Sequence, residues 1–149
     1  MEGFDVIEYP EGMPCWAPGA ADYLASILTG REACNEWGGG ASTVWLANKV
    51  AYIYVLETDP KWGKWIEDRT RDHVCVHYMK VSDPKYLYPV ISSLPMVYLI
   101  DGYRRIDCLA VVEKSASPGD IVVLDDALDY AEHLLDGPHK IRRFAQPHP

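Results

Sequence analysis

An acid, three glycines and two hydroxyl residues stand together in the run Glu36-Trp37-Gly38-Gly39-Gly40-Ala41-Ser42-Thr43. Glycines allow backbone angles that other residues avoid, and they leave no Cβ between the backbone and a bound molecule. A helix that begins at Ser42 or Thr43 would add free N–H groups, which attract a negatively charged group. The run therefore predicts a turn from a strand into a helix that holds a small molecule.

A second acid, Glu57, ends the apolar run Ala51-Tyr52-Ile53-Tyr54-Val55-Leu56. In α/β proteins that bind nucleotides, an acid about 20 residues after the glycine turn commonly binds the ribose hydroxyls. The position of Glu57 fits that role. A dinucleotide-binding turn would need a small residue in place of Thr43, and a P-loop would need Gly-Lys-Ser/Thr, which is absent. Nicotinamide cofactors and nucleoside triphosphates are therefore disfavoured.

Three further acids end later apolar runs of the chain. Asp101 follows the strand-like run at 96–100, and Asp125 and Asp126 follow the run at 120–124. Open α/β sheets bind ligands at the carboxyl ends of their strands. We therefore expect these acids near the ligand, with helix capping as the alternative role for at least one of the two C-terminal acids.

Alternating strands and helices are expected to bring these acids and glycines to one edge of a sheet. The pattern predicts strands at 32–37, 50–56, 74–78, 96–100 and 120–124, a last short strand at 141–145, and helices at 20–28, 42–49, 60–68, 106–115 and 128–135. Unbroken apolar strands that alternate with helices predict an α/β fold. The expected architecture is a Rossmann-like, doubly wound, mostly parallel sheet with helices on both faces.

The length and composition predict one domain over residues 1–149, with residues 1–19 as an irregular N-terminal arm. A formal charge of −8 without an extended basic run argues against a nucleic-acid partner. No apolar stretch is long enough for a membrane span or a signal peptide, so we expect no membrane partner and a cytoplasmic location. A small-molecule substrate is the expected partner.

The four cysteines are scattered without the spacing of a metal site, so buried free thiols are expected. His73, Cys75 and His77 would share one face of a strand, which suggests a metal site as an alternative. A single strand rarely supplies a complete ligand set. We therefore assign no metal-binding residues.

Three of these features together resemble the class I S-adenosylmethionine-dependent methyltransferases: the first turn Glu36-x-Gly38-x-Gly40, the acid Glu57 after the second strand and the acid Asp101 after the fourth. The resemblance extends over about residues 13–126. The Gly-Gly-x-Ser-Thr turn and the strand end Asp101-Gly102-x-Arg104 look closest to a small branch of these enzymes.

The resemblance implies S-adenosylmethionine as the cofactor and methyl transfer to a small-molecule acceptor as the reaction. Asp101 would be the catalytic residue, which orients the acceptor or takes its proton, and Glu57 would bind the ribose. The residues implied in cofactor binding are Glu36, Gly38, Gly39, Gly40, Ser42, Thr43, Glu57, Thr58, Asp59 and Tyr78.

The chain departs from the family pattern after Asp126, where it has room for one helix and one short strand. We therefore expect the terminal antiparallel strands of the family's sheet to be shortened or missing. The exposed sheet edge that results favours a homodimer. A shortened fold also keeps a second function open, in which the protein binds S-adenosylmethionine without methyl transfer, to sequester or degrade it or as a subunit of a complex.

In some O-methyltransferases that resemble this fold, acids at strand ends hold a divalent ion. Carboxylate oxygens suit magnesium. Asp101, Asp125 and Asp126 are therefore a second, less favoured hypothesis for a metal site.

Overall fold

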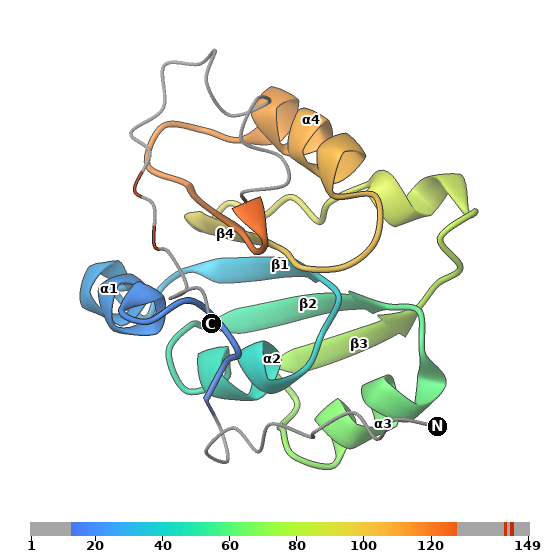
Figure 1. Ribbon diagram of the computed structural model, residues 1–149. Coiled ribbons are helices and arrows are strands. Elements are labelled where there is room, and N and C mark those ends of the chain that lie inside the picture. The colour runs from blue at the N-terminus through green and yellow to red at the C-terminus, as the bar shows by residue number, and fades with distance from the viewer. Residues whose placement is uncertain (1–12, 128–141, 143, 145–149) are drawn as a thin grey trace, which may run out of the picture.

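The computed structural model describes residues 13–127, 142 and 144 (Figure 1). The helix predicted at 128–135 lies outside these residues, and only two residues of the strand predicted at 141–145 are described. The helices are α1 (Ala20–Ile27), α2 (Ala41–Leu46), α3 (Pro60–Glu67), α4 (Arg105–Ser115) and a short 3-10 helix, η1 (Pro84–Leu87). The strands are β1 (Ala33–Trp37), β2 (Tyr52–Glu57), β3 (Val74–Tyr78), β4 (Met96–Ile100) and β5 (Ile121–Leu124). Within this part of the chain, no helix is long and apolar enough to cross a bilayer.

The five strands form one parallel sheet in the order β3-β2-β1-β4-β5. The last residue of the central strand β1, Trp37, pairs with Leu56 of β2 and Ile100 of β4. Just beyond these pairs, the Gly38 N–H donates to the Leu56 carbonyl and the Asp101 N–H donates to the Trp37 carbonyl, each at 2.9 Å. The loops that follow β1 and β4 therefore lie side by side at the carboxyl edge of the sheet.

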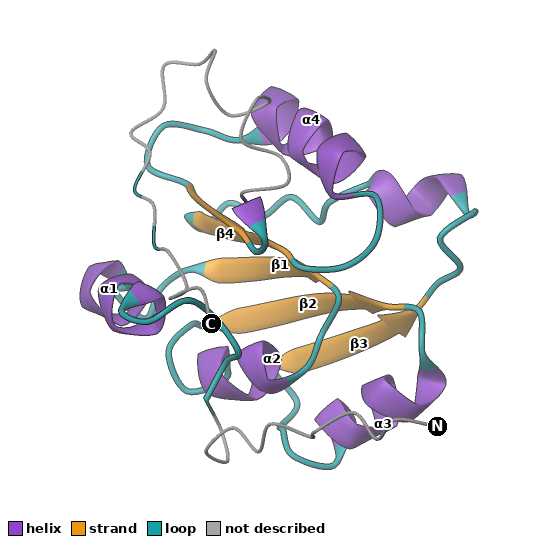
Figure 2. Ribbon diagram, viewed as in Figure 1, coloured by secondary structure: helices purple, strands orange, loops and turns teal. Residues whose placement is uncertain are grey.

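Helices cover both faces of the sheet, with α2 and α3 on one side and α4 on the other (Figures 1 and 2). On the first face, Leu46 of α2 and Ile66 of α3 join a buried cluster with strand residues. On the second face, Leu109 of α4 and Tyr86 of η1 belong to a separate buried cluster. The α/β, Rossmann-like, doubly wound architecture predicted from the sequence is confirmed.

Every residue of β1 is buried, although Asn35 and Glu36 are polar. A central strand that is covered on both faces can hold such residues only if they find hydrogen-bond partners. The Asn35 Oδ1 atom accepts the Val90 N–H at 2.7 Å, which fastens the connection between η1 and β4 to the sheet. Glu36 is bonded within the glycine turn and belongs to the candidate site.

The turn between α2 and β2 differs from the sequence prediction. The predicted helix at 42–49 ends at Leu46, because the Lys49 and Val50 N–H groups both donate to the Leu46 carbonyl and close a tight turn. Val50 is apolar and buried, but it packs into the core from this turn, and β2 begins only at Tyr52. Because Val50 is apolar and close to β2 in the sequence, the strand was predicted to begin at Val50 instead of Tyr52.

Candidate functional site

The glycine turn begins with two glycines in contact. Gly38 has a φ of 83°, and a Cβ on it would lie 2.7 Å from Gly102 Cα. A Cβ on Gly102 would in turn lie 3.0 Å from the Gly38 nitrogen. No larger residue fits at either position without movement of the backbone. The loop after β1 and the loop that carries Asp101 are therefore packed backbone to backbone.

The next two glycines differ in their surroundings. A Cβ on Gly39 would lie 2.5 Å from Ile66 Cδ1 and 2.6 Å from Val55 Cγ1, so this residue packs inward against α3 and β2. Among the residues that the structure describes, none has an atom within 4 Å of a Cβ on Gly40. Gly40 is therefore the glycine that leaves space for a ligand.

Glu36 supports the glycine turn through hydrogen bonds with two residues of α2. Its side chain is completely buried and accepts hydrogen bonds from the hydroxyls of Ser42 and Thr43. The Thr43 hydroxyl oxygen also accepts the Gly40 N–H at 3.0 Å. Burial raises the Glu36 pKa to about 7, against the lowering effect of the two hydroxyl bonds, and the nearby charge of Glu57 adds to the rise. Glu36, Ser42 and Thr43 thus form a buried brace that fixes the position of Gly40.

Glu57 closes the other side of the turn. Its Oε2 atom accepts the Gly39 N–H at 2.9 Å, and its Oε1 atom accepts the Thr58 and Asp59 N–H groups at 2.7 and 2.9 Å. A carboxylate has about four positions for hydrogen bonds. These three bonds leave one position, on Oε2. Glu57 is therefore a support of the loop as well as an acceptor that faces the site.

The remaining residues that the sequence implicated in cofactor binding have structural partners. The Asp59 carboxylate accepts the Lys61 N–H at 2.8 Å and caps α3. The ring of Tyr78 lies so close to Gly63 of α3 that a Cβ on Gly63 would come within 2.2 Å of it. Thr58 contributes its backbone N–H to Glu57. The structure thus brings Asp59 and Thr58 to the end of β2 and places the Tyr78 ring on α3.

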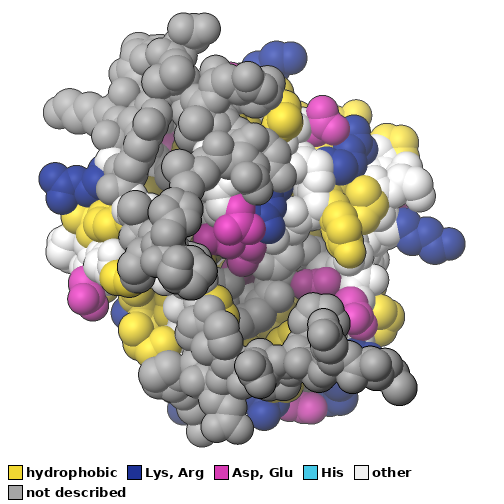
Figure 3. Space-filling model, in the orientation of Figure 1, with side chains coloured by type: hydrophobic (Ala, Val, Ile, Leu, Met, Phe, Trp, Pro, Cys, Tyr) yellow, Lys and Arg dark blue, Asp and Glu magenta, His cyan; other side chains and the backbone are white. Residues whose placement is uncertain are grey.

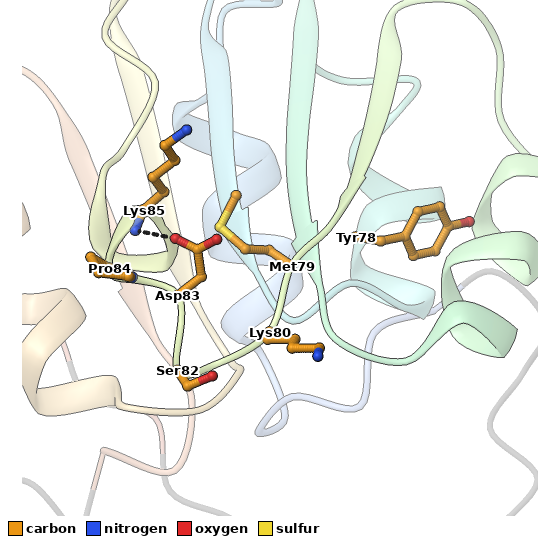
Figure 4. Close-up of a pocket in the computed structure, with 7 residues that line it drawn as sticks. All are labelled: Tyr78, Met79, Lys80, Ser82, Asp83, Pro84 and Lys85. Atoms are coloured by element: carbon orange, nitrogen blue, oxygen red, sulfur yellow. Dashed lines mark hydrogen bonds between the residues drawn. The ribbon is translucent and has the colours of Figure 1, made fainter.

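A shallow pocket of about 620 Å³ follows β3 beside the end of β2. The Met79 N–H donates to the Glu57 carbonyl at 3.0 Å. The residues that line the pocket are Tyr78, Met79, Lys80, Ser82, Asp83, Pro84 and Lys85. Figure 4 shows the Tyr78 ring pointing away from the side chains of Met79, Asp83 and Lys85. The pocket thus continues the carboxyl edge from Glu57 past β3.

Asp101 begins the loop after β4 and is held by Arg105. The Arg105 Nη2 atom donates to Asp101 Oδ1 at 3.1 Å, and Nη1 lies 3.8 Å from Asp125 Oδ2 and 3.4 Å from Asp126 Oδ2. Arg105 therefore supplies a positive charge among the three acids, at the place that the second hypothesis gave to a divalent ion. Acidic and basic side chains adjoin on the face shown in Figure 3.

The Asp101 carboxyl group is shifted toward its neutral form. Burial raises its pKa to about 8, and the charge of Asp125 and a hydrogen bond with that side chain add to the rise. Arg105 opposes the shift and Glu36 adds to it. A carboxyl group with a pKa near neutrality at the edge of a ligand loop is suited to exchange a proton.

Two residues of the site were missed by sequence reasoning. Arg105 precedes the helix predicted at 106–115, but in the structure it is the first residue of α4 and its side chain is only 15% exposed. Tyr86 had no expected role, yet its buried hydroxyl accepts the Tyr103 N–H at 3.1 Å and its carbonyl accepts the Trp37 indole N–H at 2.7 Å. Tyr86 therefore connects the loop that carries Asp101 to Trp37 at the end of β1.

The histidines and cysteine of β3 are engaged separately. Cys75 Sγ lies 3.1 Å from His77 Nε2, whereas His73 Nε2 lies 2.6 Å from the Ala47 carbonyl. Among residues 13–127, 142 and 144, no three His, Cys, Asp or Glu side chains form a group that could hold a metal ion. Cys34, Cys75 and Cys108 are free thiols, and Cys34 and Cys108 are buried as expected, whereas Cys15 is exposed.

Comparison with known proteins identifies relatives in fold only. The sequence matches no known protein family and no curated protein sequence. Precorrin 8W decarboxylase of Methanobacterium thermoautotrophicum superposes with a TM-score of 0.62 at 16% identity, over 87% of this chain and 74% of that chain. A SAM-dependent methyltransferase from Thiobacillus denitrificans, solved in complex with S-adenosyl-L-homocysteine, superposes with a TM-score of 0.54 at 13% identity.

The second comparison covers 79% of this chain and 56% of that chain, so this chain spans little more than half of the length of that methyltransferase. At such low identity, both likenesses concern the fold. They support a Rossmann-type α/β fold for this chain.

Proposed function

We propose that this chain binds S-adenosylmethionine at the carboxyl edge of β1 and β2 and transfers its methyl group to a small-molecule acceptor. The observation that carries the proposal is the setting of Gly40, which faces open space in a loop braced by the carboxylates of Glu36 and Glu57. The fold likeness to a methyltransferase in complex with S-adenosyl-L-homocysteine adds support.

The described residues fit this cofactor. Gly40 leaves room for a ligand against the backbone, and the remaining position on Glu57 Oε2 suits one ribose hydroxyl. The sequence predicted two ribose bonds to Glu57. A second bond requires the second hydroxyl to share an oxygen position or to displace the Gly39 N–H.

Asp101 is the residue proposed to act on the acceptor. When bound, S-adenosylmethionine supplies a methyl group on a sulfonium, whose leaving group is a neutral thioether. The chain then has to orient the acceptor and to receive its proton where the acceptor must lose one. The Asp101 side chain is 30% exposed and begins the loop that packs on Gly38, so it can reach an acceptor beside the glycine turn.

A second candidate function is cofactor binding without methyl transfer. The fold neighbour with the higher TM-score is a decarboxylase, so the shared architecture by itself does not select methyl transfer. In this reading the glycine turn and Glu57 keep their roles, and Asp101 has no acceptor to serve.

Incubation of the purified chain with S-adenosylmethionine separates these functions. Formation of S-adenosylhomocysteine that depends on an added amine, phenol or carboxylate supports methyl transfer. Loss of the cofactor without any acceptor indicates degradation, and stable binding without turnover indicates a binding protein. No binding at all contradicts both candidates.

A further inference from the structure

The Arg105 side chain forms hydrogen bonds with the loop after β4 and with the loop after β5. Its Nε atom donates to the Gly102 carbonyl at 3.0 Å, and Nη2 donates to the Asp101 carbonyl at 2.9 Å as well as to the Asp101 carboxylate. Its Nη1 atom donates to the Asp125 carbonyl at 2.7 Å. One guanidinium thus joins the end of β4, the start of α4 and the end of β5.

The adjacent Arg104, which caps α4, is an ordinary surface arginine and serves as a comparison. Its Nε atom pairs with Asp107 at 2.9 Å, and the two side chains are 36% and 52% exposed. Exposed pairs of this kind contribute little to stability. The Arg105 side chain is only 15% exposed and donates from all three nitrogens of its planar guanidinium, which lysine could not reproduce.

We propose that Arg105 is a positioning residue, which holds the Asp101 carboxylate at the edge of the glycine turn in the orientation that meets an acceptor. The proposal rests on the proposed function, because the orientation of Asp101 matters only if a methyl acceptor binds beside it. Arg105 binds Asp101 Oδ1, so Oδ2 is the oxygen left to receive a proton. Asp125 lies beside the same guanidinium, with its Oδ2 atom 3.8 Å from Arg105 Nη1, and its negative charge favours a proton on Asp101.

The charges around Asp101 give Arg105 a second effect. The groups that face Asp101 are Arg105, Asp125 and Glu36, and Asp126 contacts Arg105 on its exposed side. Within the described part of the chain, the charged neighbours that remain without Arg105 are acids. Asp101 would then retain its proton to higher pH, since an opposite charge within about 4–6 Å is what favours the ionised form.

The test compares Arg105→Gln and Arg105→Lys with the matched control Arg104→Gln. The Asp101 carboxyl group is titrated by NMR in protein labelled with 13C-aspartate, and its signal is assigned with Asp101→Asn. We expect the titration midpoint to rise by at least about one pH unit in Arg105→Gln. Arg105→Lys keeps the charge but loses the fork, so a smaller rise is expected, and Arg104→Gln should match the wild type.

Three outcomes overturn the proposal or separate it from the proposed function. An unchanged Asp101 midpoint in folded Arg105→Gln overturns the role of Arg105. If Arg105→Gln does not fold, Arg105→Lys is the deciding variant. An unchanged Asp101 midpoint together with an unchanged kcat in Arg105→Lys overturns the proposal. A raised midpoint with a lower kcat, at unchanged KM for the cofactor, supports it. A wild-type chain that binds no S-adenosylhomocysteine overturns the proposed function instead, whatever Arg105 does to the titration.

Discussion

The Glu57 carboxylate accepts the Gly39 N–H at 2.9 Å and thereby ties the end of β2 to the glycine turn after β1. Hydrogen bonds to a charged acceptor contribute about 1.5–3 kcal/mol each. The same carboxylate holds the Thr58 and Asp59 N–H groups, so the loop has its shape before a ligand arrives. A preformed loop loses less conformational entropy on binding.

Replacement of this carboxylate should weaken cofactor binding. In Glu57→Gln, an NH2 group would replace one oxygen and face a backbone donor, and a ribose hydroxyl would lose its charged acceptor. We expect the dissociation constant of S-adenosylhomocysteine to rise at least about tenfold, which corresponds to 1.4 kcal/mol. Isothermal titration calorimetry measures this. Glu113→Gln, an exposed acid of α4, is the matched control, and equal constants in both variants would remove Glu57 from the site.

Gly39 and Gly40 should respond in opposite ways to the same substitution. Gly40→Val places a side chain in open space, so it should leave the melting temperature near that of the wild type and abolish cofactor binding. Gly39→Val collides with Ile66 and Val55, so it should lower the melting temperature. Circular dichroism melts and calorimetry on both variants test the pair. Normal affinity in Gly40→Val would show that the ligand does not pass over Gly40.

Glu36 should make stability depend on pH. Its pKa is about 7 in the fold and 4.5 ordinarily, so its contribution to stability is fully present below pH 4.5 and is lost as the pH rises through 7. One pKa unit corresponds to about 1.4 kcal/mol, which gives a loss of up to about 3 kcal/mol. Urea unfolding at pH 5 and pH 8 should show this loss in the wild type and a smaller one in Glu36→Gln. The same pH dependence in both proteins would assign it to other groups.

Asp101 should serve the chemical step and leave the cofactor in place. A base acts in its ionised form, so with a pKa of about 8 the turnover should rise as the pH passes through that value. Asp101→Asn should bind S-adenosylmethionine within a few-fold of the wild type and lower kcat by about 100-fold or more. Weakened binding with unchanged turnover of the bound cofactor would make Asp101 a cofactor-binding residue.

The chain is also expected to form a homodimer. Within the described residues, β3 and β5 stand at the two edges of the sheet, and edge strands are commonly covered by a partner. Light scattering at micromolar concentration should then give twice the chain mass of 16.8 kDa. A mass equal to one chain would contradict the expectation.

The fold was predictable because most of its strands are short, mainly apolar runs that alternate with helices. The strand β1 holds the polar Asn35 and Glu36, and its prediction depended on the glycine turn that follows it. The predicted bounds of β3 and β4 agree with the structure, and β4 stands between Pro95 and Asp101, which mark its two ends in the sequence. Glu36 and Glu57 were recognised as site residues because they stand at strand ends, beside or at a set distance from the glycines. The buried bond from Thr43 to Glu36 spans seven positions and follows from local spacing. The bond from Gly39 to Glu57 spans 18 positions and follows from the pairing of β1 with β2.

Arg105 and Tyr86 were not predictable in the same way. Arg105 bonds the Asp125 carbonyl 20 positions away, and Tyr86 accepts from Trp37 49 positions away. Both contacts involve backbone atoms, which carry no residue-type signal. The short run Asp101-Gly102-x-Arg104 pointed to the correct loop, but to the neighbouring arginine.

The most direct test of the central claim is a calorimetric titration of the wild-type chain with S-adenosylhomocysteine, with Gly40→Val as its reference. The account predicts one ligand per chain for the wild type and no heat of binding for Gly40→Val, which keeps a native circular dichroism spectrum. A wild-type chain that shows no binding at ~1 mM ligand, where even an affinity of about −4 kcal/mol would be seen, contradicts it.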